Sequence, residues 1–150
     1  MYHFNKNYFD IIDNYNKAYW LGFIAADGNV RKDLLKIRIE LNIKDKAHLE
    51  KFRQDIEGDM PIREWIRSNN HSCYIEVNCK KWGIELSKYG IVPNKSLILN
   101  INWELIPQDL QKYFIRGYFD GDGSLNLYDA RGYDEWELSF ISTEKVLKDF

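Results

Sequence analysis

The feature that most constrains this chain is an internal repeat. The segment WLGFIAADGNV at 20–30 is matched 95 residues later by IRGYFDGDGSL at 115–125. Glycine, aspartate and glycine recur at equivalent places, as the pairs Gly22 and Gly117, Asp27 and Asp122, and Gly28 and Gly123. Self-similarity at a fixed spacing indicates that one supersecondary unit has been used twice. The chain is therefore expected to fold as two related units.

Each copy of the repeat is predicted to be a helix with one face of small residues. Gly22 and Ala26 lie four residues apart in the first copy, as Gly117 and Gly121 do in the second. Residues at that spacing share a helix face, and small side chains let two helix backbones approach closely. We therefore expect a helix interface formed by these four residues. Each helix is expected to end at Asp-Gly, with the glycine in the left-handed C-terminal conformation.

The repeat continues beyond each glycine as a predicted β-hairpin and a second helix. In the first copy, strands at 28–31 and 35–43 precede a helix that Asp45 is expected to cap. In the second copy, strands at 124–128 and 135–141 precede a helix capped by Ser142 or Thr143.

Only the first copy goes on to further predicted elements. Strands are expected at 62–67 and 73–78, and a helix at 80–89 ends at Gly90. The prediction is an α+β fold with antiparallel sheets. A first unit at 1–106 has the order helix-strand-strand-helix-strand-strand-helix, and a second unit at 107–150 ends within its second helix. We expect a fragment or a truncated reading frame.

The composition excludes several classes of protein. Hydrophobic residues make up 45% of the 150, which is typical of a globular chain, and no apolar run approaches the length of a membrane span. The N-terminus does not resemble a secretory signal, and two cysteines cannot build a disulfide framework or a four-thiolate zinc site. An intracellular, non-secreted protein is expected, and phage, bacterial and organelle origins are not distinguished. The net charge of -2 argues against a nonspecific nucleic-acid coat.

The nonamers at 20–28 and 115–123 resemble the paired signature helices of LAGLIDADG homing endonucleases. Their spacing is similar to that of the single-chain, two-motif branch, and GIVPNKSL at 90–97 is similar to the segment that closes the first unit there. In that family the helices cross at the unit interface, and each eighth-position carboxylate lies near one scissile phosphate. Those positions are Asp27 and Asp122 here. At the sixth position Ala25 departs from the family's aspartate, which is retained as Asp120.

The resemblance implies a metal-dependent hydrolysis of phosphodiesters. A divalent metal held by carboxylates neutralises phosphate charge and assists the leaving group, and Mg²⁺ (or Mn²⁺) suits such a site. We expect Asp27 and Asp122 as metal ligands and catalytic residues, with backbone carbonyls at Ala26 and Gly121 beside them. By resemblance, Lys95 is the basic residue that assists catalysis in the first unit. Asn42 and Ser139 are the water-ordering positions. Each residue also has a plain alternative: Asp-Gly turns, a solvated lysine and ordinary polar strand residues.

The predicted strands also suggest a DNA-binding surface. The strand at 36–43 alternates polar and apolar side chains, and 31–44 carries five basic residues against two acidic ones. A two-stranded ribbon fits the major groove of DNA, although a solvated sheet face alternates in the same way. The expected DNA-binding residues are Asn29, Arg31, Lys36, Arg38, Glu40, Arg63, Trp65, Arg67, Tyr74, Glu76, Asn78, Ser124, Asn126, Tyr128 and Glu137.

The functional prediction is a site-specific endonuclease acting on double-stranded DNA with a long target site. Neither a membrane partner nor a small-molecule substrate is expected. A completed chain is expected to be a monomer. A truncated one is expected to need a dimer or another partner, and to be inactive for lack of the second unit's strands and lysine. Three alternatives stay open: a non-cleaving LAGLIDADG-type DNA-binding regulator, an RNA maturase and an unrelated α+β binding module.

Overall fold

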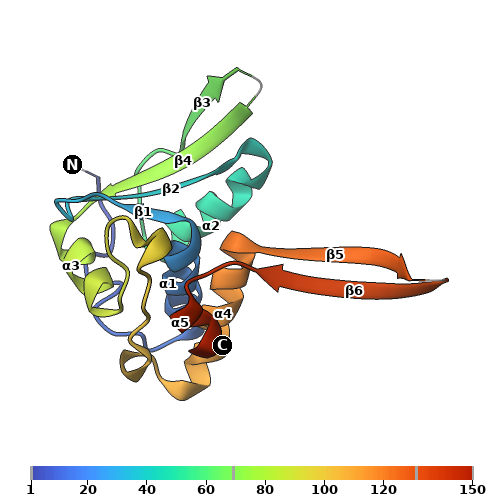
Figure 1. Ribbon diagram of the computed structural model, residues 1–150. Coiled ribbons are helices and arrows are strands. Elements are labelled where there is room, and N and C mark those ends of the chain that lie inside the picture. Colours follow the sequence, from blue (N-terminus) through green and yellow to red (C-terminus); the bar gives the residue numbers. More distant parts are fainter. Residues whose placement is uncertain (1, 69, 131, 150) are drawn as a thin grey trace.

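Two helices packed side by side form the centre of the computed structural model, which describes residues 2–68, 70–130 and 132–149 (Figure 1). They are α1 (Tyr15–Asp27) and α4 (Gln108–Asp122), and theirs is the most extensive contact between described elements. A Cβ added at Gly22 would overlap the carbonyl of Phe114, and one at Gly117 would overlap that of Tyr19. The two backbones therefore touch at the small residues, and any side chain there would separate the helices.

Both helices end at glycine, but neither glycine is left-handed. Gly28 has φ −71° and ψ 142°, and Gly123 has φ −88° and ψ 161°, so both are extended and the predicted conformation is wrong. The next strand begins at the glycine itself, whose N–H still bonds the last turn of the helix. A Cβ on Gly28 would lie 2.6 Å from the carbonyl oxygen of Ile24. Glycine is required here because the strand leaves close to the helix.

The first half of the chain forms a four-stranded antiparallel sheet. Its order is β1-β2-β4-β3, from β1 (Gly28–Val30), β2 (Lys36–Asn42), β3 (Arg63–Arg67) and β4 (Asn70–Asn78). The inner face is apolar, with central side chains that are at most 2% exposed, and it packs on α1, α2 (Lys46–Asp55) and α3 (Lys80–Lys88). These inward side chains are Ile37, Ile39, Ile75 and Val77. The α+β fold with antiparallel sheets is thus as predicted, and the alternating strand pattern is explained by one covered face.

The ends of the shorter elements refine the predicted caps. Asp45 makes no side-chain capping bond, because a 3-10 turn η1 (Ile43–Asp45) precedes α2. Asn42 caps that turn instead, since its Oδ1 accepts from the N–H of Lys44 at 3.0 Å. Thr143 Oγ1 accepts from the N–H of Val146 at 3.4 Å, so Thr143 rather than Ser142 caps α5 (Glu144–Asp149). Gly90, where this helix was predicted to end, follows α3 with φ +90°, a left-handed conformation.

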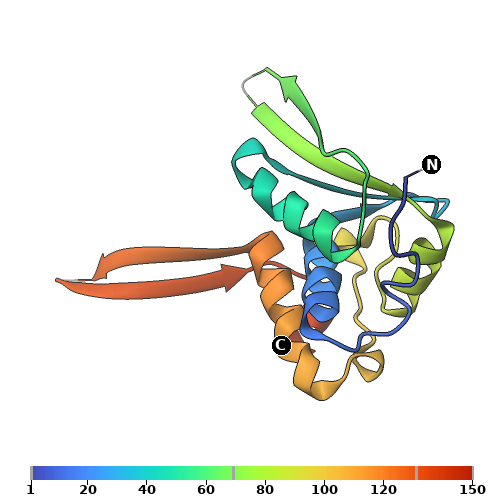
Figure 2. The same ribbon diagram turned by 180° about the vertical axis from the view of Figure 1, so that it is seen from behind.

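The second hairpin lies in different surroundings from the first. β5 (Gly123–Ala130) and β6 (Tyr133–Phe140) form a two-stranded sheet that projects away from the rest of the molecule (Figures 1 and 2). Its apolar face is exposed, with Leu125, Leu127, Trp136 and Leu138 each 50–64% accessible. In the first half the equivalent face is covered by helices and extended by β4. The repeat therefore predicts the hairpin itself but not its burial.

Two further 3-10 turns link α3 to α4. They are η2 (Lys95–Leu97) and η3 (Trp103–Leu105), and Asn94 before η2 has a left-handed φ of 57°. This link carries Lys95 back to the ends of the central helices. Among the described residues, no helix is both long and apolar enough to cross a membrane.

Candidate functional site

The two aspartates of the repeat lie at the same end of the central helix pair. Residues of α1 and α4 meet in parallel order: Gly117 lies against Tyr19 and Phe23, and Gly121 against Ala26 and Asp27. The pKa of Asp27 is raised to about 6, chiefly because the surrounding protein displaces solvent and secondly because of the charge of Asp122. Although the side chain of Asp27 is exposed, its carboxylate is thus electrostatically coupled to that of the second helix.

Lys95 supplies the positive charge at this end of the helices. Its side chain is only 9% exposed, and within the described part of the chain it is the sole charged residue classed as buried. The Nζ atom donates a hydrogen bond to the carbonyl oxygen of Ala26 at 2.9 Å. Burial lowers the pKa of Lys95, while the charges of Asp27 and Asp122 act in the opposite direction. The buried ammonium is therefore hydrogen-bonded to one carbonyl and lies within the electrostatic influence of two carboxylates.

These surroundings suit a cation. The Lys95 ammonium is itself a cation bound by the last turn of α1, where backbone carbonyls and the helix dipole favour positive charge. Nowhere in 2–68, 70–130 and 132–149 do three or more His, Cys, Asp or Glu side chains gather as a metal site. Asp27 and Asp122 fit a metal such as Mg²⁺, which binds one or two carboxylates and completes its shell with water and phosphate. The carbonyl of Ala26, predicted as a metal ligand, is bonded to Lys95 here. Gly121 contributes close contact with Ala26.

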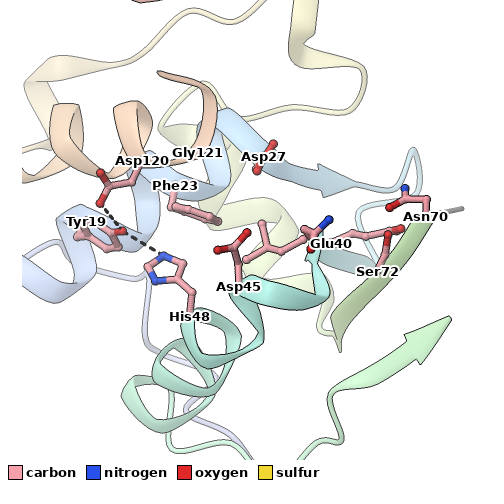
Figure 3. A pocket seen from close by; sticks show the side chains of 12 residues that line it. Tyr19, Phe23, Asp27, Glu40, Asp45, His48, Asn70, Ser72, Asp120 and Gly121 are labelled. Carbon is pink, nitrogen blue, oxygen red and sulfur yellow. Dashed lines mark hydrogen bonds between the residues drawn. The ribbon is translucent and has the colours of Figure 1, made fainter. Parts of the chain in front are cut away.

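An open cleft of about 720 Å³ lies beside Asp27, between the helices and the adjoining ends of β2 and β4 (Figure 3). Three of its side chains, one from each of three elements, are joined by hydrogen bonds. Tyr19 Oη donates to Asp120 Oδ2 at 2.8 Å and is 3.1 Å from His48 Nε2. Since the single hydroxyl proton goes to Asp120, His48 Nε2 is the donor in the second bond.

Burial of this network affects both of its titratable rings. It lowers the pKa of His48 and raises that of Tyr19, whose hydrogen bond to Asp120 acts in the same direction. Sequence reasoning missed Tyr19 and His48, because the three groups come from α1, α2 and α4. The one available signal was Asp120, which has no acidic counterpart at Ala25.

The two predicted water-ordering residues lie in different places. Asn42 lines the cleft together with Asp27, with its Oδ1 used in capping η1. Ser139 lies at the base of the second hairpin, where its Oγ is 2.8 Å from Ser124 Oγ. The structure thus brings Asn42 to the same cleft as Asp27, and Ser139 pairs across the second hairpin.

The predicted DNA-binding residues fall on two separate sheet faces. Those of the first sheet lie on its outer face, opposite the buried side chains; this set is Asn29, Lys36, Arg38, Glu40, Arg63, Trp65, Arg67, Tyr74, Glu76 and Asn78. Arg31 follows β1 and donates to Asp33 at 2.8 Å. The remaining four share the polar face of the hairpin, namely Ser124, Asn126, Tyr128 and Glu137. That hairpin has no basic side chain in its described part, and the basic residues of the predicted set belong to the first sheet and its β1 end.

No family model matches this chain. The uncharacterized protein MJ0314 of Methanocaldococcus jannaschii is 27% identical over 142 residues, which cover 88% of this chain and 50% of that protein. The chain therefore spans about half the length of this curated relative.

Two solved structures are similar at a TM-score of 0.44 each. One is the LAGLIDADG meganuclease I-CpaMI bound to uncleaved DNA, at 15% identity, with 81% of this chain and 64% of that one covered. The other is the I-LtrWI LAGLIDADG homing endonuclease bound to target DNA, at 13% identity, with 89% and 66% covered. Membership of that family stays a prediction, and it rests on the two motifs of this chain.

Proposed function

We propose that this chain is a LAGLIDADG-type endonuclease that hydrolyses double-stranded DNA at a specific site with Mg²⁺ or Mn²⁺. The observation that carries the proposal is the position of Lys95. A buried ammonium at the shared end of two closely packed helices, coupled to Asp27 and Asp122, is an expensive arrangement for a purely structural role. Ionisable groups of opposite charge that lie close together and have shifted pKa values are typical of active sites.

The side chains divide the chemistry among them. Asp27 and Asp122 would hold the metal, and Asp27 does so as the carboxylate, which predominates above its pKa of about 6. A bound divalent metal supplies Lewis-acid stabilisation of the phosphate charge. Lys95 places a second positive charge where the phosphate must approach, and burial strengthens its effect on developing negative charge.

The outer face of the first sheet provides the support for DNA as the substrate. Arg63 and Arg67 are exposed on β3, and β2 adds two further basic residues to the same face. A sheet of this kind matches the major groove. The cleft beside Asp27 is bordered by Asn70 and Ser72 of β4, so the proposed catalytic end of the helices adjoins the sheet that would hold the duplex (Figure 3).

The test is cleavage of a randomised double-stranded DNA library with Mg²⁺ by the product of the complete reading frame, followed by sequencing of the new ends. We expect a discrete target, and we expect Asp27→Asn, Asp122→Asn and Lys95→Met each to abolish cutting. Asp109→Asn is the matched control, because this exposed carboxylate lies in the first turn of α4, at the opposite end of the helix. This control should cut normally.

Other outcomes select the alternative functions. Sequence-specific binding in EDTA without cleavage under any metal would show a non-cleaving regulator. Tighter binding of structured intron RNA than of DNA would show a maturase. Binding of neither nucleic acid would refute the proposal.

A further inference from the structure

The centre of the first sheet's outer face holds a cluster built around one arginine. We propose that Arg38 reads a guanine base in the major groove, and that Glu40 and Glu76 are positioning residues that hold its guanidinium for this purpose. The proposal rests on the DNA-binding function proposed above and assigns one residue to one base.

Three neighbours fix the Arg38 side chain. Its guanidinium carbon lies 3.7 Å from the centre of the Tyr74 ring, so the plane of the group is set by a cation–π contact. Nη2 is 2.7 Å from Glu40 Oε2, and Nη1 is 3.8 Å from Glu76 Oε2. Register explains the grouping, since Arg38 pairs with Glu76 across β2 and β4, and Glu40 pairs with Tyr74. An arginine held on three sides loses little conformational entropy when it binds a base.

Glu40 is a positioning residue because both of its oxygens are already used. Oε2 bonds Arg38, and Oε1 accepts from the indole Nε1 of Trp65 at 2.7 Å. The indole therefore anchors the carboxylate that anchors the arginine. Arg38 keeps hydrogens to offer, because each Nη carries two and one carboxylate contact uses only one of them. Its Nε is buried, so contact with a base must be made by the Nη atoms.

The local charge argues for a base contact rather than a phosphate contact. Lys36 Nζ is 3.2 Å from Glu76 Oε2, so two basic and two acidic side chains balance at the centre of the face. All four are 25–33% exposed. Phosphate binding draws its affinity from uncompensated positive charge, which this centre lacks. The exposed Arg63 and Arg67 of the neighbouring β3 are better placed for phosphates. A rigid planar fork instead matches O6 and N7 of guanine, which lysine cannot imitate.

The experiment begins with binding sites selected from random duplex DNA by the wild-type protein in EDTA. Dissociation constants are then measured for the selected site, for unrelated DNA and for a site in which single guanines are replaced by 7-deazaguanine, which lacks N7. We expect Arg38→Lys to weaken the selected site about tenfold, to erase the preference at one guanine and to leave unrelated DNA unchanged. At that guanine, 7-deazaguanine should weaken the wild type and have no further effect on Arg38→Lys. Arg53→Lys is the control and should show neither effect, because Arg53 lies in the last turn of α2, on the opposite side of the sheet.

Removing a positioning charge gives the second readout. Glu76→Gln releases Lys36 and Arg38, so affinity for unrelated DNA should rise, and the slope of log K against log salt should steepen by about one unit. If Arg38→Lys keeps the sequence preference, or if 7-deazaguanine affects both proteins equally, the readout by Arg38 is refuted. An unchanged salt slope in Glu76→Gln would refute the role of Glu76. Failure of the wild type to bind any DNA would refute the proposed function itself.

Discussion

The contact between Gly121 and Ala26 allows a sharp test of the helix interface. A Cβ added at Gly121 would lie 2.7 Å from the Cβ of Ala26, whereas ordinary contacts begin at 3.4 Å. Gly121→Ala therefore forces the last turns of α1 and α4 apart by about 0.7 Å. Since the obstacle is a side-chain atom, the substitution Ala26→Gly removes it. The swapped pair carries one methyl between the helices, as the wild type does.

The magnitudes follow from opposing terms. Overpacking costs about 1–3 kcal/mol, and replacing glycine by alanine in a helix returns up to about 1 kcal/mol, so Gly121→Ala should lose about 1 kcal/mol of unfolding free energy. Ala26→Gly should lose about 1 kcal/mol or slightly more, through helix propensity and lost contact. The double variant should be close to wild type. The coupling free energy is then about −1 to −2 kcal/mol, in the range measured for residues in contact.

The assay is urea denaturation of the four proteins, followed by circular dichroism. Each kcal/mol also corresponds to about 2–4 °C in Tm for a chain of this size. Gly117→Ala is the contrasting variant, because its Cβ would overlap the backbone carbonyl of Tyr19 and no side-chain substitution can make room. It should lose more stability than Gly121→Ala. Additive effects of the Gly121 and Ala26 substitutions, within about 0.3 kcal/mol, would refute the proposed packing.

Four other predictions concern titration and the hydrogen-bond network of Tyr19. The pKa of Asp27 is about 6 in the folded protein and 3.8 for the free side chain. Between these pH values the folded state binds a proton that the unfolded state has lost, so the free energy of unfolding falls as pH rises from about 4 to 6. Asp27→Asn should therefore be more stable than wild type above pH 6, by about 1 kcal/mol after screening at this exposed site, and equal to it below pH 4, as followed by thermal denaturation. Cleavage by the wild type should fall as pH drops through about 6, the pKa of Asp27. In Lys95→Met the pKa of Asp27, measured by NMR titration, should rise, because the charge of Lys95 lowers that pKa in the wild type. Tyr19→Phe removes both hydrogen bonds of its hydroxyl and should cost about 1–2 kcal/mol in urea denaturation, whereas the exposed Tyr15→Phe should cost little.

The sequence predicted those features that depend on local periodicity. Small residues four positions apart predicted the α1–α4 contact, and the polar-apolar alternation predicted the outer and inner faces of the sheet. Helix ends were predicted less well, because a glycine after a helix can be required for either of two reasons. Glycine is needed at Gly90 for its positive φ, but at Gly28 for close approach to Ile24. Composition cannot separate these cases, since both exclude a side chain.

The repeat predicted the two aspartates of the candidate site, whereas Lys95 was named from the family resemblance alone. Asp27 and Asp122 follow from the repeat, and their coupling follows from helices that pack in parallel. The burial of Lys95 depends on a path through two 3-10 turns, which no periodic pattern encodes. Likewise, the bond between Tyr19 and His48 joins residues 29 positions apart on different helices. Such contacts arise from tertiary packing, so a single sequence carries no signal for them.

The sixth position of the two repeated nonamers, Ala25 and Asp120, lies in different surroundings in α1 and in α4. Ala25 is 2% exposed, since α1 is covered on nearly every side, and an aspartate there would be a buried, unpaired charge. α4 is covered on fewer sides, and its Asp120 is exposed and accepts a hydrogen bond from Tyr19 of the partner helix. An acidic residue thus stands at the sixth position only in the helix that leaves it solvated and partnered. Burial accounts for the alanine at position 25, whereas Asp27 and Asp122 both lie at exposed helix ends.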